Sequence, residues 1–400
     1  MPKNKPGNQP GFIVTITMQP YSETTLLQAA QDLISVPSTV DNPEGLRTAY
    51  SYVLDMVRSC GKAITVEEFE SGGEPSFLAY ASGPRPETFH IILNGHLDVV
   101  PGTPEQYRPY VADDKLYGRG AYDMKAAAIV LAAMFCEYVD KVPYPLALQI
   151  VTDEEHTGHD GTKYQVQQGV RGDFVICGDC GRTPDVFEIA NEAKGSTFVE
   201  IGFDGISSHG AYPWNADNPI AKAANFAQKL YQRYPTPLEA TGETTIAITG
   251  INADSGALTK IPNLATVSLD ARFVAGDPHF RSEADFSALI QSIDSDARII
   301  KFHDFSAPIY TSPDNPLLLS LKASAEMVEG TQFSFARRNG TSDGRFYGSV
   351  GNQACEFGIA GENQHSEDEY ITLQAFRNYI ATMRDFLGKT ITTERSTRVR

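Results

Sequence analysis

Short apolar runs of strand length alternate with helical patterns along much of this chain, and this alternation constrains its fold more than any other feature. The runs "FHIILNG", "LALQIVT" and "DFVICG" read as buried strands, whereas "TLLQAAQDLI" and "KAAAIVLAAMFCEYV" read as helices. Such alternation predicts an α/β domain with a mostly parallel sheet covered by helices. Ligands of such sheets bind beyond the carboxyl ends of the strands, so the residues that directly follow these strands are the first candidates for a site.

The pattern changes near Glu192. "STFVEIGFDG" and "ATVSLDARFVAG" alternate apolar and polar residues with period two, as one-sided antiparallel strands do, and they predict an inserted α+β domain. The α/β pattern then resumes, so the chain leaves the first domain and returns to it. We expect an N-terminal arm, a first domain in two segments, an insertion and a disordered basic tail: 1–22, 23–191 with 306–388, 192–305 and 389–400.

Composition limits the classes of partner. A chain of 400 residues suggests two domains, and a formal net charge of −17 makes nucleic acids and anionic membranes poor partners. No apolar run has the length of a membrane span, so we expect a cytoplasmic protein. The five cysteines are scattered, which argues against a disulfide framework. One CxxC, Cys177 to Cys180, lacks the second pair of a typical zinc site and any thioredoxin-like context.

Two clusters of polar residues follow predicted strands or open a helix. In "GHLDVVP", His96 and Asp98 are two apart and would point the same way from an extended strand, so that Asp98 could accept the second ring N–H of a metal-binding His96. In "LYGRGAYDMK", Asp123 lies between a Gly-rich turn and a helix. Each has an ordinary alternative: a hydrogen-bonded histidine at a strand end, and a helix N-cap.

A third cluster, "TDEEHTGHDGT", places Asp153, Glu154 and Glu155 directly after a buried strand. Three adjacent carboxylates repel one another unless a cation holds them or solvent screens them, so a divalent metal site and a solvated acidic loop are both open. We interpret Glu155 as a ligand, Asp153 as a supporting charge, and His156 and His159 as loop residues outside the metal shell.

Asp179 and His365 also lie after predicted strands. Zinc binds histidine nitrogen and carboxylate oxygen, and two metals can activate a shared water. Glu154, beside a ligand and not needed as one, is then the natural general base. Two zinc ions could be held if one carboxylate bridges them, by these five residues: His96, Asp123, Glu155, Asp179 and His365.

These stretches resemble the co-catalytic zinc amidohydrolases, the family of succinyl-diaminopimelate desuccinylase, acetylornithine deacetylase, aminoacylase and related carboxypeptidases. Besides the three clusters, the matching stretches are "KGS", "SSHGAYPWNADNPIAKAA", "IPNLATVSLDARF", "NGTSDGRFYG" and "ACEFG" followed by "QHSEDEY". They follow the family's order from about residue 23 to residue 388. "TSDGRF" and "HGAYPWNADNPI" look most like the desuccinylase.

The resemblance implies one metal on His96 and Asp179, a second on Glu155 and His365, and Asp123 as the bridge. It also implies that Asp98 orients His96 and that Glu154 acts as base and later as acid. The inserted domain is implied to act as a lid and to form a homodimer. In that dimer, the resemblance implies that His209 reaches the partner's active site as an oxyanion donor. From the residues alone, a loop histidine with a local hydrogen bond is the simpler interpretation.

Substrate binders are carried over in the same way: Lys194, Arg272, Thr341, Ser342 and Arg345. Arginine matches a carboxylate with two hydrogen bonds, so Arg272 and Arg345 are candidate clamps for a substrate carboxylate, with a surface ion pair as the alternative. Three positions depart from the desuccinylase pattern: Asp179 replaces Glu, Lys194 replaces Arg, and Thr259 replaces the Asn of many members.

The sequence therefore predicts metal-dependent hydrolysis of the amide bond of an N-acyl amino acid, with a carboxylated acyl group such as succinyl. A metal-bridged water would attack and Glu154 would take its proton. Zinc is the first expectation for the two divalent ions, and cobalt or manganese would also fit. The alternatives are an exopeptidase for dipeptides or short peptides, and a catalytically silent metal-binding protein.

Overall fold

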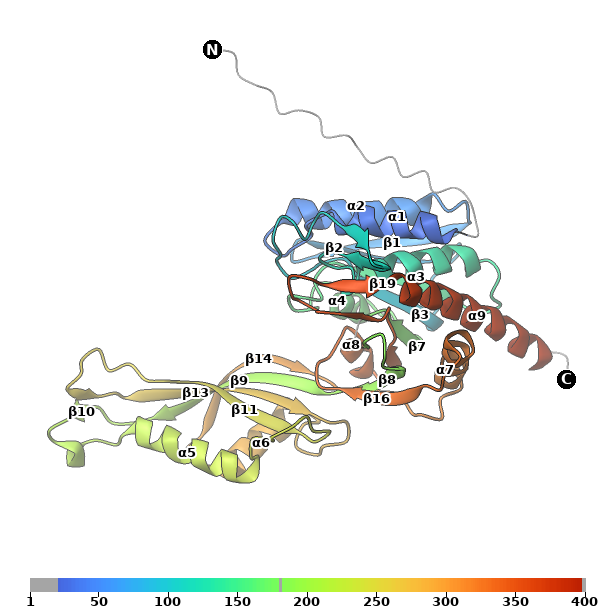
Figure 1. Cartoon of the computed structure of the whole chain (residues 1–400). Helices are drawn as coiled ribbons and strands as arrows, with labels where there is room; N and C mark the ends of the chain where they lie inside the picture. Colours follow the sequence, from blue (N-terminus) through green and yellow to red (C-terminus); the bar gives the residue numbers. More distant parts are fainter. Residues whose placement is uncertain (1–20, 180–181, 398–400) are drawn as a thin grey trace, which may run out of the picture. The chain divides into compact units, whose positions relative to one another are not determined.

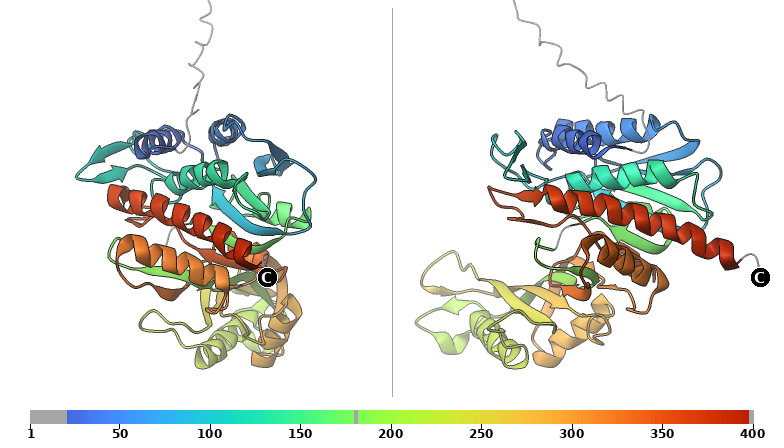
Figure 2. Two further views of the ribbon diagram at one scale, coloured as in Figure 1. Left: turned by 90° about the vertical axis from the view of Figure 1, so that its right-hand side faces the viewer. Right: turned by 45° about the vertical axis from the view of Figure 1, so that its right-hand side comes forward.

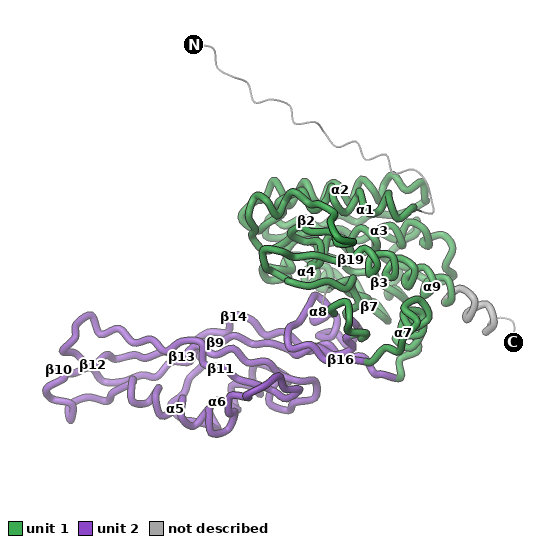
Figure 3. The backbone as a smooth tube through the Cα atoms, viewed as in Figure 1, with its two compact units in different colours: residues 1–189, 314–334, 356–400 green, residues 190–313, 335–355 purple. Residues whose placement is uncertain are grey.

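The computed structural model describes residues 21–179 and 182–397, and for 390–397 it describes the backbone alone. The chain divides into two compact units, coloured separately in Figure 3. Unit 1 comprises residues 1–189, 314–334 and 356–400, and unit 2 comprises 190–313 and 335–355. The predicted insertion, 192–305, lies within the first segment of unit 2. Unit 2 also takes in 335–355, which the sequence pattern placed with the catalytic segments.

Unit 1 is built on a sheet whose central strands are parallel, and Figure 1 labels several of its elements. In the described part of the chain the sheet has nine strands, and the five that lie wholly in unit 1 run in the spatial order β1 (Ile64–Ser71), β2 (Glu74–Ala81), β6 (Leu146–Val151), β3 (Phe89–His96) and β7 (Gly172–Cys177). β3 lies parallel to both β6 and β7, whereas β1 and β2 add an antiparallel edge. This confirms the α/β class. The antiparallel edge was not predicted, because an apolar run does not reveal the direction in which its strand pairs.

The register of the parallel strands brings their carboxyl ends together. His96 pairs with Val151, the last residue of β6, and Asn94 pairs with Cys177, the last residue of β7. Residues that follow β3, β6 and β7 therefore emerge at one edge of the sheet, as the polar clusters require.

Helices of unit 1 cover this sheet: α1 (Glu23–Ile34), α2 (Pro43–Arg58), α3 (Lys125–Tyr138), α4 (Thr162–Gln167), α7 (Pro316–Glu329) and α9 (Leu373–Thr397). α3 is apolar on all sides and almost wholly buried, since it contacts β3, β6 and the helices α1, α2 and α9. α9 packs between α3 and α7, as both views in Figure 2 show.

The structure describes only part of the two predicted terminal segments. Residues 1–20 of the predicted arm lie outside the described residues, and Ser22 caps α1 through a hydrogen bond from the backbone N–H of Thr25 to its Oγ. α9 continues as backbone helix to Thr397 and so covers most of the tail that was predicted to be disordered. A helix that is already nucleated by packing extends at little cost, one hydrogen bond for each residue added.

A small antiparallel sheet joins two loops of unit 1 that matter below. Its strands are β18 (Gly361–Glu362), β19 (Tyr370–Thr372), β5 (Lys115–Tyr117) and β4 (Tyr110–Ala112). Tyr370 of β19 pairs with Tyr117 of β5. The loop after β5 and the loop before β19 are therefore neighbours, although about 250 residues separate them in the chain.

Unit 2 contains a four-stranded antiparallel sheet backed by two helices. The strand order is β11 (Thr245–Asn252), β13 (Leu264–Phe273), β9 (Gly195–Asp204) and β14 (Arg298–Ser306). α5 (Pro219–Arg233) and α6 (Glu283–Ile293) cover one face of it. The remaining elements of unit 2 are β10 (Ser208–His209), a 3-10 turn (Pro213–Asn215), β12 (Lys260–Ile261), β15 (Ile309–Tyr310) and α8 (Gly344–Gly348). Three strands lie at the unit boundaries: β8 (Glu188–Ala193), β16 (Ser334–Arg338) and β17 (Gln353–Glu356).

Phe226 of α5 anchors the core of unit 2. It is fully buried, and its ring centroid lies 5.4 Å from that of Phe203 on β9. We expect Phe226→Ala to destabilise the protein by about 3–5 kcal/mol, through lost burial and the cavity left behind. Urea unfolding measures the change, and Gln228→Ala, at an exposed position of the same helix, is the matched control. A loss below about 1 kcal/mol would contradict the packing described here.

Candidate metal centre

His96, the last residue of β3, is buried and directed by its neighbours. Its Nδ1 lies 3.0 Å from the backbone oxygen of Asp98 and 3.5 Å from the Asp98 carboxylate. A proton on Nδ1 donated to that carbonyl leaves Nε2 facing Asp123 Oδ1, at 3.1 Å. The ring is thus oriented as a metal ligand requires.

Asp123 lies in the loop before α3, and its carboxylate is shared by two imidazoles. Oδ1 faces His96, and Oδ2 lies 3.2 Å from Nε2 of His365. Gln364 Nε2 also donates to Oδ2, at 2.6 Å. The N-cap alternative for Asp123 is wrong, because α3 begins after Met124 and has no side-chain cap.

Glu155 follows β6 and approaches the same centre. Its Oε1 lies 3.1 Å from His365 Nε2, and its backbone N–H donates to Asp98 Oδ2 at 2.8 Å. The carboxylate of Asp98 therefore makes its shorter contact with the Glu154–Glu155 peptide, and only its backbone carbonyl lies within hydrogen-bonding distance of His96.

Two groups of donors converge in this part of unit 1. Within each group the ligand atoms lie within 4.8 Å of one another, and the groups are His96, Asp123 and Asp179, and Asp123, Glu155 and His365. Asp123 belongs to both. The structure thus brings together all five residues predicted as ligands, in the two sets that a shared carboxylate would join, and the mixed nitrogen and oxygen donors fit a pair of divalent cations such as zinc.

The pKa shifts of these residues also support a metal-binding site. Burial raises the pKa of Asp123, but hydrogen bonds from His365 and His96 outweigh it and hold that pKa well below its usual range. Hydrogen bonds to Asp123 and Glu155 raise the pKa of His365 to about 10. Burial opposes protonation of His96, yet Asp123 and Asp98 raise its pKa well above the ordinary value. Burial also raises the pKa of Glu155. The carboxylates thus favour positive charge at this centre.

The loop from Asp153 to Gly161 is held in a defined shape. The backbone oxygen of Asp153 accepts hydrogen bonds from the N–H groups of His156, Thr157 and Gly158, and its Oδ2 accepts one from Asp160 at 2.7 Å. A Cβ at position 161 would lie 2.2 Å from Asp153 Oδ1, so only glycine fits there. Asp153 therefore supports the segment that carries Glu154.

Neither His156 nor His159 joins the donor groups found among the described residues. His156 is exposed and His159 half-buried. Cys60, Cys136, Cys177 and Cys355 are buried, whereas Cys180 lies outside the described residues, so the predicted CxxC pair is described only in part.

Two predicted residues of unit 2, His209 and Lys194, have hydrogen-bond partners within that unit. His209 is exposed, and its Nδ1 accepts the N–H of Ala211 at 3.0 Å. Lys194 is buried and donates to the backbone oxygen of Thr241 at 2.9 Å.

Arg272 forms a fork with Asp270, at 2.7 and 3.2 Å, and stacks on Phe198. Its guanidinium is thus already engaged by a carboxylate of the chain, which weakens the expectation that it clamps a substrate. Arg345, by contrast, is buried in α8, with its guanidinium 4.4 Å from the ring centroid of Phe346. The hydroxyls of Thr341 and Ser342 are buried and have no hydrogen-bond partner among the described residues.

Sequence reasoning missed three residues around the centre: Gln364, Arg119 and Glu369. Gln364 contacts Asp123, and the other two form a buried ion pair between the loops of Asp123 and His365. No spacing rule identifies them, since their partners lie about 250 residues away. The one signal in the sequence was Arg119, a charged residue within the turn "GRGAYD", which is buried in the structure.

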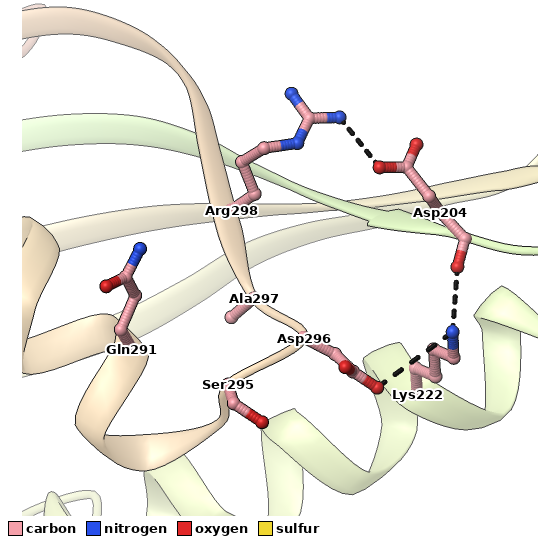
Figure 4. A pocket seen from close by; sticks show the side chains of 7 residues that line it. All are labelled: Asp204, Lys222, Gln291, Ser295, Asp296, Ala297 and Arg298. Carbon is pink, nitrogen blue, oxygen red and sulfur yellow. Dashed lines mark hydrogen bonds and ion pairs between the residues drawn. The ribbon is translucent and has the colours of Figure 1, made fainter.

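Unit 2 also has a surface hollow of about 350 Å³, shown in Figure 4. Its cations are already paired: Arg298 with Asp204 at 3.0 Å, and Lys222 with Asp217 at 2.5 Å and Asp296 at 3.9 Å. Balanced, exposed charges of this kind give a ligand little to bind, so the converging donors of unit 1 are the stronger candidate for a functional site.

The model of one protein family, described as "Peptidase family M20/M25/M40", matches residues 92–389 of this chain. The chain belongs to this family, and it is a hydrolase of amide bonds. This confirms the resemblance seen in the sequence. No helix among the described residues combines the length and apolar character that a membrane span requires.

Individual relatives agree with the family. A succinyl-diaminopimelate desuccinylase of Stenotrophomonas maltophilia is 31% identical over 299 residues, which cover 70% of this chain and 78% of that protein. An M20 family metallo-carboxypeptidase of Sulfolobus solfataricus has a similar structure, with a TM-score of 0.72, 19% identity, and coverage of 92% of this chain and 99% of that one. A dinuclear metal-binding peptidase of Bacillus subtilis has a TM-score of 0.65 at 16% identity, with coverage of 93% and 99%.

Proposed function

We propose that this protein removes a carboxylated acyl group, such as succinyl, from the nitrogen of an amino acid in a reaction that requires two divalent metal ions. The observation that carries the proposal is the shared carboxylate of Asp123, which belongs to both donor groups at the edge of the sheet. Support for the acyl group comes from the relatives that are named desuccinylases.

The proposed ligands are His96 and Asp179 for one ion, Glu155 and His365 for the other, and Asp123 for both. Zinc is the expected metal, since imidazole and carboxylate suit it, and cobalt or manganese would also bind such a site. A bound metal pair would supply Lewis-acid activation of the substrate carbonyl and of the attacking water.

The residues of the chain supply the proton transfers. Glu154 takes the proton of the attacking water and gives it to the leaving amine. Asp98 holds the Glu154–Glu155 peptide through the N–H of Glu155, which keeps the base beside a ligand. Base and ligand are adjacent in one loop, so the loop that Asp153 stabilises sets the position of both.

Arg345, Thr341 and Ser342 are the proposed binders of the substrate carboxylate, with Lys194 as a further cation. The buried hydroxyls of Thr341 and Ser342 support this assignment, because a buried hydroxyl is costly unless something bonds to it. Arg272 has only a supporting role in substrate binding, because its guanidinium already donates two hydrogen bonds to the Asp270 carboxylate.

The competing activity is that of an exopeptidase on dipeptides or short peptides, because the same donor set cleaves either kind of amide. The carboxypeptidase and dipeptidase names of several structural neighbours favour it. A silent metal-binding protein would have no need of Glu154 beside the ligands.

Hydrolysis of N-succinyl-diaminopimelate, N-acetylornithine and a dipeptide set, by protein stripped of metal and reloaded with zinc, tests the proposal. Zinc-dependent cleavage of the succinyl compound with the highest kcat/KM is the expected result. Preference for dipeptides would transfer the proposal to the exopeptidase, and inactivity on every compound after reloading would favour the silent protein.

We also propose a homodimer formed by unit 2, with His209 serving the partner's active site as an oxyanion donor. β11 is an edge strand in the described sheet, and Ile251 on it is 51% exposed. Light scattering should give twice the 43.7 kDa of the chain, and Ile251→Lys should shift the mass toward one chain. A wild-type mass of 43.7 kDa would overturn the dimer. The cytoplasmic location stays a prediction.

A further inference from the structure

A buried ion pair connects the two loops that carry Asp123 and His365. Arg119 lies in the loop after β5 and Glu369 in the loop before β19, and their side chains are 3% and 0% exposed. Arg119 Nη1 donates to Glu369 Oε2 at 2.5 Å. Neither residue belongs to the donor groups of the metal centre.

Glu369 holds the backbone of the Asp123 loop. Its Oε1 accepts three hydrogen bonds from backbone N–H groups, those of Gly120 at 2.9 Å, Tyr122 at 2.9 Å and Asp123 at 3.1 Å. One carboxylate oxygen thus holds three of the four residues from Gly120 to Asp123, and with them the direction in which the Asp123 side chain leaves the backbone.

Arg119 holds the other loop. Its Nη2 donates to the backbone oxygen of Ser366 at 3.2 Å, and Gln106 Nε2 donates to the same oxygen at 2.8 Å. The preceding residue, His365, has a backbone φ of 61°, in the left-handed region that residues other than glycine rarely adopt. Such a conformation persists only where its surroundings enforce it, and two donors on the adjacent carbonyl do so.

Stability is a poor explanation for this arrangement. A buried ion pair loses much of its attraction to desolvation, and apolar residues of similar volume often stabilise a protein as well or better. The pair differs from an apolar filler in one respect: it satisfies backbone groups in both ligand loops at once.

We infer that Arg119 and Glu369 are positioning residues that fix the separation of Asp123 and His365, and thereby set the affinity of the Asp123, Glu155 and His365 group for its divalent cation. This inference rests on the proposed function, because it requires those three residues to be ligands. The effect acts through the loops, since neither side chain reaches the cation as a ligand.

Glu369→Gln and Arg119→Lys test the inference. Gln keeps the volume of Glu369 but loses its charge, and Lys cannot donate to Glu369 and Ser366 together as the forked guanidinium does. Titration of metal-free protein with zinc, in competition with a chromophoric chelator, should show two binding steps for the wild type. In both variants we expect the dissociation constant of at least one step to rise about 10–100-fold, since Asp123 belongs to both donor groups.

Glu137→Gln is the matched control. Glu137 is also a buried carboxylate on an arginine fork, that of Arg384, and it accepts the backbone N–H of Tyr21. It lies near the far end of α3, about 18 Å along the helix from Lys125. This control should lose stability without a change in either zinc step. The absorption spectrum of cobalt(II)-loaded protein gives a second readout, and it should change in the Glu369 and Arg119 variants alone.

Each outcome of the zinc titrations and cobalt spectra either supports or overturns the positioning role. Wild-type zinc affinities in Glu369→Gln and Arg119→Lys, with a wild-type cobalt spectrum, would overturn the positioning role and leave the proposed function intact. If Glu369→Gln does not fold, Arg119→Lys decides alone. Failure of the wild-type protein to bind two zinc ions would overturn the proposed metal centre and this inference with it.

Discussion

Replacing Glu154 with Gln is expected to lower kcat for amide hydrolysis by about 10²–10⁴-fold while two metal ions remain bound. Gln has the shape of Glu but accepts no proton at neutral pH, so the attacking water loses its base and the leaving amine loses its acid. The donor groups do not include Glu154, so the metal centre should survive the change. Steady-state kinetics on the best substrate of the panel, with metal content measured on the same sample, checks both parts.

His156→Gln is the matched control for that experiment, because His156 is an exposed residue of the same loop and lies outside the donor groups. It should keep wild-type kcat. Ordinary turnover in Glu154→Gln would remove Glu154 from the mechanism, and loss of metal in that variant would instead make Glu154 a ligand.

Asp123→Asn should have the broadest effect, because Asp123 is the one residue found in both donor groups. The amide lacks the charge that holds a cation between two sites, so metal content should fall below two ions per chain. Loss of several kcal/mol of Lewis-acid stabilisation corresponds to a rate lower by about 10³-fold or more. Metal analysis and kcat/KM after reloading with zinc measure the two losses.

A thermal shift provides the control for folding. Zinc should raise the melting temperature of the wild type, because a ligand that binds only the native state stabilises it, and the rise should be largely absent in Asp123→Asn. Asp173→Asn, which removes an exposed carboxylate of β7 paired with His90, should respond to zinc as the wild type does. Two zinc ions retained by Asp123→Asn would show that Asp123 is not the bridge.

The sequence alone determined which residues are the metal-ligand candidates and where in the fold they lie. His96 ends an apolar strand and Glu155 and Asp179 follow such strands, and the pattern of a buried run that ends in polar residues is local. Parallel strands end at one edge, so the edge could be predicted once the strands were recognised. The family resemblance then assigned the pairs, and the structure brings each pair close to Asp123.

Only the tertiary structure decided how the donors are held. The N-cap and bridging interpretations of Asp123 are equivalent in sequence, and they separate only because α3 begins after Met124 and two imidazoles approach the carboxylate. Gln364, Arg119 and Glu369 show no local pattern, since their contacts join the loop after β5 to the loop before β19. Arg272 is a local case: its sequence suggests a clamp, and Asp270, two residues earlier on β13, already pairs with its guanidinium. Apolar periodicity records which side chains are buried, whereas the convergence of polar atoms depends on strand register and loop conformation, which contacts between distant segments determine.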